Sequence, residues 1–125
     1  MLAVAAMPWL AGCHERQVTV EETPIRIISE QVGRGRIADD GRTVYIDYEV
    51  TLPGGETVLK HKDWRFVVGA GSVVEGMDEA VRGMRAGGER TVDCPPHKHW
   101  GRIGHGDEIP PNTNLIFHVK LNRVE

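Results

Sequence analysis

The residues best suited to bind a metal lie between positions 94 and 105. Cys94, His97, His99 and His105 would supply the thiolate and imidazole ligands that suit Zn²⁺. Their Cys-x-x-His-x-His spacing matches no standard zinc finger, and a Pro pair interrupts it. We therefore assign no metal and no cofactor, and keep a zinc site as an alternative.

Two other classes of function find no support in the sequence. It contains no Gly-x-Ser-x-Gly motif, and no Ser, His and Asp can be assigned as a hydrolytic triad. The net charge of the 125 residues is −3, which does not favour nucleic acid or an anionic membrane surface as a partner.

A long loop with the sequence HWGRIGHGDEIPPNT (99–113) follows the third quarter of the chain. Loops of this length inside a compact domain are usually functional or disordered. Trp100, Ile103 and Ile109 argue against disorder, so the loop is interpreted as part of a binding site. Its prolines are expected to stiffen the start of the last strand.

The segments that must position this loop are predicted to be strands with one helix between them. Alternating or β-branched runs predict strands at 24–30, 43–52, 64–69, 89–94 and 114–124, and 57–63 is ambiguous between strand and loop. A single amphipathic helix needs an apolar sheet face as its partner. The sequence therefore predicts an α+β fold with an antiparallel sheet.

The helix is predicted over residues 72–88. Its apolar stripe consists of Val74, Met77, Val81 and Met84. Ser72 and Glu75 form a candidate capping box at the start, and Gly87-Gly88 would end the helix. The interior glycines Gly76 and Gly83 are unfavourable in a helix, so we expect them to mark places where another segment approaches closely.

From Gly33 to Glu125 the chain resembles the FKBP-type peptidyl-prolyl cis-trans isomerases. The motifs that carry the resemblance are GRTVYIDYEVTLPGGETV, WRFVVGAGSVVEGMDEAVRGMRAGGERTV and HWGRIGHGDEIPPNTNLIFHVKLNRVE. The resemblance implies a twisted antiparallel sheet wrapped around one short helix, with an apolar cleft between them. It also implies proline-containing polypeptides as substrates and macrolides as possible ligands.

The resemblance also assigns the cleft residues by position. Those expected to act in catalysis are Tyr48, Trp100 and Phe117, and those expected to bind substrate are Val58, Trp64, Phe66, Val73, Val74, Met77, His105 and Ile109. In relatives, the backbone N–H at the position of Val74 donates to a ligand carbonyl. The first N–H groups of a helix lack intrahelical partners, which makes such a bond available.

The chain departs from the family pattern within the cleft. Leu59 replaces the family's active-site Asp, Trp100 replaces a Tyr, Met77 replaces a Trp and Val58 replaces a Phe. The apolar slot is kept while polar partners are lost, so we expect isomerase activity to be reduced and macrolide affinity to be altered. The alternative is an FKBP-like binding module or chaperone for apolar or proline-containing segments.

The first residues resemble a bacterial lipoprotein signal. An uncharged apolar run ends in Leu10-Ala11-Gly12-Cys13, although no Lys or Arg precedes it. The expected organisation is a signal at 1–12, a tether at 13–23 and the domain at 24–125. Lipidation of Cys13 would anchor a monomeric domain in the cell envelope. If the segment is not a signal, the domain would be cytoplasmic. A disulfide between Cys13 and Cys94 is a further alternative to lipidation.

Overall fold

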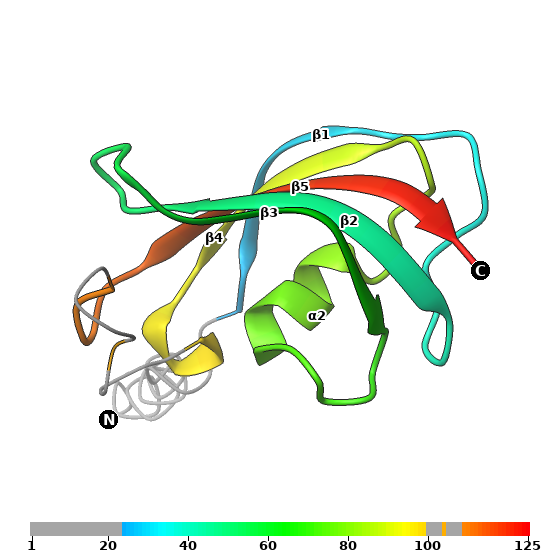
Figure 1. The fold of residues 1–125 in the computed structure, drawn as a ribbon. Coiled ribbons are helices and arrows are strands. Elements are labelled where there is room, and N and C mark those ends of the chain that lie inside the picture. Colours follow the sequence, from blue (N-terminus) through cyan, green and yellow to red (C-terminus); the bar gives the residue numbers. More distant parts are fainter. Residues whose placement is uncertain (1–23, 100–103, 105–108) are drawn as a thin grey trace, which may run out of the picture.

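The computed structural model of the protein describes residues 24–99, 104 and 109–125. Within these ranges, five strands form one sheet, and a short α-helix lies against its concave side (Figure 1). The elements follow in the order β1 (Arg26–Gln31), β2 (Thr43–Thr51), β3 (Thr57–Val67), α2 (Glu75–Val81), β4 (Glu89–Cys94), the 3-10 helix η2 (Pro96–Lys98) and β5 (Leu115–Val124). The predicted α+β class is confirmed.

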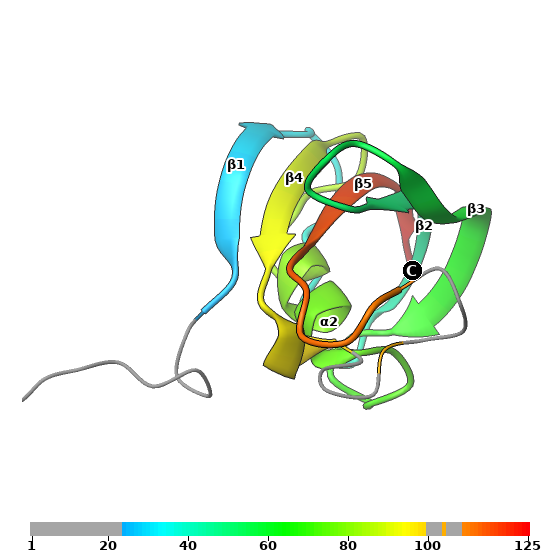
Figure 2. The ribbon, with the colours of Figure 1, turned by 90° about the vertical axis from the view of Figure 1, so that its left-hand side faces the viewer.

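The sheet is antiparallel throughout, with the strand order β1-β4-β5-β2-β3. Figure 2 shows that it curls around α2, so that the concave face and the helix enclose the core. β5 follows the predicted alternation, and its inward residues Leu115, Phe117, Val119 and Leu121 are buried. The two central strands, β5 and β2, therefore carry the apolar face against which the helix packs.

β3 is one long strand, where the sequence indicated an ambiguous segment followed by a short strand. The pairing of β3 with β2 shifts register between Ile46 and Tyr48. At the shift, Asp63 has a φ of 52°, and its N–H donates to Asp47 Oδ1 at 2.8 Å. An extra residue in one strand breaks the alternation with period two. Because of this bulge, the pattern of the sequence did not show that β3 is one continuous strand.

α2 is much shorter than predicted. It ends at Val81, and Gly83, with a φ of 85°, turns the chain well before the Gly87-Gly88 pair. The predicted capping box of Ser72 and Glu75 is wrong, because Val74 is the N-cap and no side chain caps the helix. Beyond the helix the apolar stripe still reaches the core, since Met84 is buried. Periodicity identified the buried face, but it did not identify the end of the helix.

Gly76 allows α2 to approach the sheet closely, as its unfavourable place in a helix predicted. A Cβ atom at Gly76 would collide with Cys94 Sγ and would lie 3.0 Å from the carbonyl oxygen of Lys98. Cys94 is a free thiol, fully buried at the end of β4. The absence of a side chain at Gly76 thus sets the distance between the helix and β4.

Arg90 of β4 stabilises the other end of α2. Its Nη1 donates to the carbonyl oxygens of Ala80 at 3.0 Å and Arg82 at 3.2 Å, and its Nη2 pairs with Glu30 of β1 at 2.5 Å. The last carbonyl groups of a helix lack intrahelical donors. In this protein, the guanidinium of Arg90 supplies the missing donors.

β1 is exposed along its whole length, contrary to the predicted alternation of apolar and polar residues. Its pairing with β4 shifts register between Ile27 and Ser29. Ile27 and Ile28 are 47% and 48% exposed. In Figure 2, β1 lies at the edge of the sheet, to the side of α2, so the helix does not cover it.

Candidate functional site

An apolar cavity of about 510 Å³ lies between α2 and the concave face of the sheet. A cavity of this size can hold a small ligand or a few residues of peptide. The described residues that line it are Ile46, Tyr48, Val50, Leu59, His61, Trp64, Ser72, Val73, Val74, Met77 and Phe117. None of them carries a carboxylate, and most are aliphatic or aromatic.

Six of the predicted site residues meet in this cavity. They are Tyr48, Trp64, Val73, Val74, Met77 and Phe117. Phe117 and Met77 are 0% and 5% exposed, and they also belong to the hydrophobic core. The alternation of β2 and β5 turns Val50 and Phe117, which are paired residues, to the same inner face.

An aromatic cluster of Tyr48, His61 and Trp64 forms the wall on the β2–β3 side. The Tyr48 and Trp64 rings lie 5.7 Å apart between centroids at 73°. The His61 ring lies 5.4 Å from Tyr48 and 4.7 Å from Trp64. The tilted and edge-to-face arrangements are those that aromatic rings prefer. The three rings therefore hold one another in place.

The cavity lining includes several groups that can donate a hydrogen bond, among them the Tyr48 hydroxyl and the Val74 N–H. Burial raises the pKa of Tyr48, so its hydroxyl stays protonated and can donate across the physiological pH range. Val74 accepts from Met77 and Asp78 through its carbonyl, at 3.0 and 3.2 Å. Its own N–H meets no acceptor among the described residues. Both groups are therefore available to a carbonyl oxygen of a bound molecule.

Three predicted binding residues lie in the core and not on the cavity lining. Val58, Phe66 and Ile109 are 9%, 4% and 1% exposed, and the lining does not include them. Trp100 and His105 lie outside the residues that the structure describes.

A hydrogen bond joins the two ends of the loop at 99–113. His99 Nε2 lies 2.8 Å from the carbonyl oxygen of Thr113, so a protonated Nε2 donates across the base of the loop. Burial lowers the pKa of His99 and outweighs the bond to Thr113, which raises it. Gly104, with a φ of 74°, contacts the carbonyl of Ile109 so closely that a Cβ would not fit. The two ends of the loop are thus joined to each other, and Gly104 lies against Ile109 within it.

His61 is one of the lining residues that the sequence analysis did not assign to the site, together with Ile46, Val50 and Ser72. It lies two residues after Leu59 on β3, and opposite residues of the antiparallel pair, Val50 and Tyr48, line the same cavity. Extending the alternation of a strand through the ambiguous segment would have placed both residues on the inner face.

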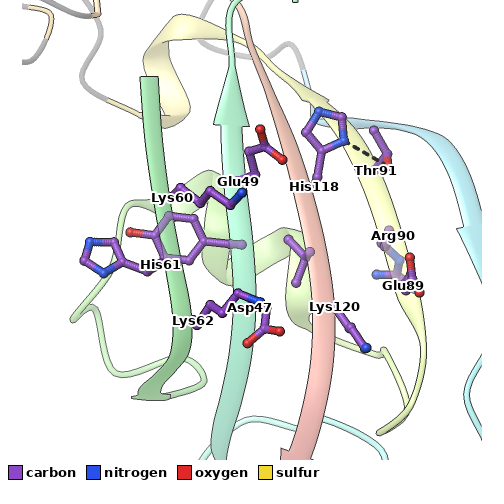
Figure 3. A pocket seen from close by; sticks show the side chains of 12 residues that line it. Asp47, Glu49, Lys60, His61, Lys62, Glu89, Arg90, Thr91, His118 and Lys120 are labelled. Atoms are coloured by element: carbon purple, nitrogen blue, oxygen red, sulfur yellow. Dashed lines mark hydrogen bonds between the residues drawn. The ribbon is translucent and has the colours of Figure 1, made fainter. Parts of the chain in front are cut away.

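A second, shallow groove of about 260 Å³ lies on the outer face of the sheet (Figure 3). Lys60 and Lys62 extend over this face toward Glu49 and Asp47, whereas the His61 ring lies beyond the free edge of β3. Asp47 also accepts from Asn122 at 2.9 Å. The groove mixes acids with bases, and its charges largely compensate one another.

The alternative zinc site gains no support from the described part of the chain. No group of three or more His, Cys, Asp or Glu residues there could hold a metal ion. Burial raises the pKa of the Cys94 thiol to about 12, whereas zinc binds the thiolate. His97, three residues after Cys94, has both ring nitrogens buried and without a hydrogen-bond partner among the described residues.

Among the described residues, no helix is long and apolar enough to span a bilayer.

Comparison with known proteins decides the family. Residues 35–122 match the family model of the FKBP-type peptidyl-prolyl cis-trans isomerases. The chain belongs to this family. The match covers all the described residues that line the cavity.

Curated relatives of this FKBP domain are longer proteins. It is 36% identical over 104 residues to the 39 kDa FK506-binding nuclear protein of Drosophila melanogaster, a match that spans 80% of this chain and 29% of the fly protein. It is 37% identical over 95 residues to peptidyl-prolyl cis-trans isomerase FKBP53 of Arabidopsis thaliana, spanning 73% of this chain and 20% of the plant protein. The chain thus spans less than a third of the length of these relatives.

Solved structures share the fold. A peptidyl-prolyl cis-trans isomerase from Pseudomonas syringae pv. tomato superimposes with a TM-score of 0.69 at 26% identity, covering 81% of this chain and 74% of the other. AtFKBP13 superimposes with a TM-score of 0.72 at 26% identity, covering 81% and 91%. The predicted sheet wrapped around one short helix is therefore the FKBP fold.

Proposed function

We propose that the cavity between α2 and the β2–β3 wall accelerates rotation about X–Pro bonds in polypeptides. The observation that carries this proposal is the lining itself, which is apolar, aromatic and free of carboxylates in its described part. The FKBP family membership agrees with it.

The chemistry requires neither a nucleophile nor a cofactor. Rotation about an X–Pro bond is slow because it breaks amide resonance, a barrier of about 18–20 kcal/mol. The twisted amide has lost part of its dipole, so an apolar cavity favours it over the planar ground state relative to water. Such preferential binding of the transition state lowers the barrier.

The described residues divide this work between shape and hydrogen bonding. Phe117 and Met77 form an apolar floor for the Pro ring, and Trp64 forms a side wall. The Tyr48 hydroxyl and the Val74 N–H donate to the flanking carbonyl groups. Trp100, in the loop at 99–113, is proposed to close the cavity from the remaining side.

The test is an isomerisation assay on X–Pro peptides with residues 24–125 and with the full chain. We expect acceleration by the wild type and a loss of at least tenfold in kcat/KM for Trp64→Ala and Tyr48→Ala. Lys120→Gln, on the outer face of the sheet, is the matched control and should behave as wild type. A folded wild-type protein that accelerates no X–Pro peptide would overturn the proposal.

The second candidate function is a binding module that holds proline-containing or apolar segments without catalysis. Leu59 and Met77 favour it, because both line the cavity where the family pattern has an Asp and a Trp. Peptide binding, detected by Trp fluorescence without acceleration of isomerisation, distinguishes the module from the enzyme.

Ligands and assembly follow from the same site. We propose that macrolides of the FK506 type compete with peptide for the cavity, because both present carbonyl groups on an apolar body. The domain is proposed to act as a monomer. Competition in the isomerisation assay and sedimentation of the purified protein test the two statements.

A lipid anchor at Cys13 is proposed from the Leu10–Cys13 motif alone, and this part of the chain lies outside the described residues. Expression of the full chain in a bacterium with a labelled fatty acid should label the wild type but not Cys13→Ser. An unlabelled wild type would favour the cytoplasmic alternative.

A further inference from the structure

We propose that His61 gives the cavity a preference for an acidic side chain next to the substrate proline. This inference rests on the proposed function. Its basis is the position of His61, an exposed ionisable side chain at the edge of an otherwise apolar lining.

On the cavity side, the described neighbours of His61 carry no charge. β2 presents the ring of Tyr48, whose hydroxyl stays neutral because burial raises its pKa. The segment before α2 presents Ser72, Val73 and Val74 to the cavity, and β5 presents Phe117. None of the described residues on the cavity lining carries a carboxylate that could pair with His61.

The other charged residues near His61 belong to the outer groove, which His61 also borders. Lys60 and Lys62 extend over the outer face, where Glu49 and Asp47 lie (Figure 3). The N–H of Asp63 is held by Asp47 in the bulge. His61 is therefore the one basic side chain among the described residues of the cavity lining.

The location also fits a residue beside the proline. His61 contacts Trp64 and Tyr48, which wall the slot proposed for the Pro ring. The His61 ring lies beyond the free edge of β3, on the open side of the sheet (Figure 3). A side chain that projects from the peptide over this edge reaches the imidazole without entering the apolar floor.

The expected selectivity follows from an exposed ion pair. An imidazole N–H can donate to a carboxylate, whereas the side-chain amide of a glutamine offers only a neutral acceptor. An exposed pair corresponds to roughly two- to fivefold in an equilibrium or rate ratio. We expect kcat/KM for a Glu-Pro peptide, divided by that for the matched Gln-Pro peptide, to be higher by this factor in the wild type than in His61→Gln.

The experiment measures this ratio by exchange NMR on Glu-Pro, Gln-Pro and Leu-Pro peptides, with peptide binding followed in parallel by Trp fluorescence. The ratio should fall in His61→Gln and keep its wild-type value in Lys60→Gln and Lys62→Gln. An unchanged ratio in His61→Gln, while Leu-Pro is still accelerated, would overturn the role of His61 alone.

The proposed function and this inference fail in different ways. If no peptide is accelerated, catalysis is lost as a proposal, and the binding ratio of the Glu and Gln peptides still reports on His61. If neither peptide binds, the inference is overturned as well.

Discussion

The sulfur of Cys94 occupies the space that a side chain on Gly76 would need. The two residues are far apart in the sequence but meet where α2 crosses the end of β4, and Gly76 also lies against the carbonyl of Lys98 and the ring of Phe117. Since Phe117 and Met77 line the cavity, this contact sets the distance between the two sides of its floor.

Gly76→Ala should therefore destabilise the protein although alanine is the better helix former. Overpacking costs up to about 3 kcal/mol, which exceeds the gain of about 1 kcal/mol in helix propensity. We expect the double variant with Cys94→Ala to recover part of the loss, with a coupling energy of about 1 kcal/mol or more. Denaturant unfolding of the two single variants and the double variant measures it, and strictly additive effects would contradict the contact.

Because of Cys94, the free energy of unfolding should also fall at alkaline pH. Burial raises the pKa of its thiol from 9.0 to about 12 in the fold. Between these values the unfolded chain loses the proton that the folded chain keeps, so the free energy of unfolding decreases by about 1.4 kcal/mol per pH unit.

Other groups titrate in the same range, so the measured quantity is the difference in unfolding free energy between wild type and Cys94→Ala from pH 8.5 to 11. The difference should shrink as the pH rises. A constant difference would show that the thiol does not contribute. The same burial predicts that Cys94 in the folded protein resists alkylation.

The sequence predicted the cavity where alternation was regular and failed where the backbone departed from it. β5 alternates without interruption, so Phe117 could be placed on the inner face. In β3, the bulge at Asp63 separates Leu59 and His61 from Trp64 by an irregular step. Because the bulge interrupts the period, the segment before it was left ambiguous, and the regular alternation of Leu59 and His61 was not used.

The helix shows a similar limit. Met84 continues the apolar stripe of α2 and is buried, yet Gly83 has already ended the helix. The stripe reports which residues face the core, whether or not they are helical. Likewise, Val58 and Phe66 were assigned to the cavity by position in the family pattern, but they lie in the core behind it. Whether a buried residue lines a cavity depends on the atoms around it, which the pattern does not contain.

Arg90 should contribute far more to stability than Arg82, although both are arginines near the end of α2. The Arg90 side chain is 11% exposed and joins the helix carbonyls to Glu30, whereas the Arg82 side chain is 42% exposed and pairs with Asp40. Arg90→Gln should lower the free energy of unfolding by about 2 kcal/mol, and Arg82→Gln by less than about 1 kcal/mol. Equal losses in urea unfolding would show that Arg90 does not secure the helix end.

Leu59→Asp should increase the affinity for FK506-type macrolides while it lowers stability. Leu59 lines the cavity where the family pattern has an Asp, and a carboxylate there would give the lining a strong acceptor for ligand hydroxyl groups. A hydrogen bond to a charged group contributes about 1.5–3 kcal/mol, so we expect about tenfold tighter binding. The cost is desolvation of the carboxylate, about 1–3 kcal/mol in the unfolding free energy. Leu59→Asn is the matched control: it keeps the shape and an acceptor without the charge, and should show a smaller gain by calorimetric titration. No gain in either variant would mean that the lost polar partner does not limit macrolide binding.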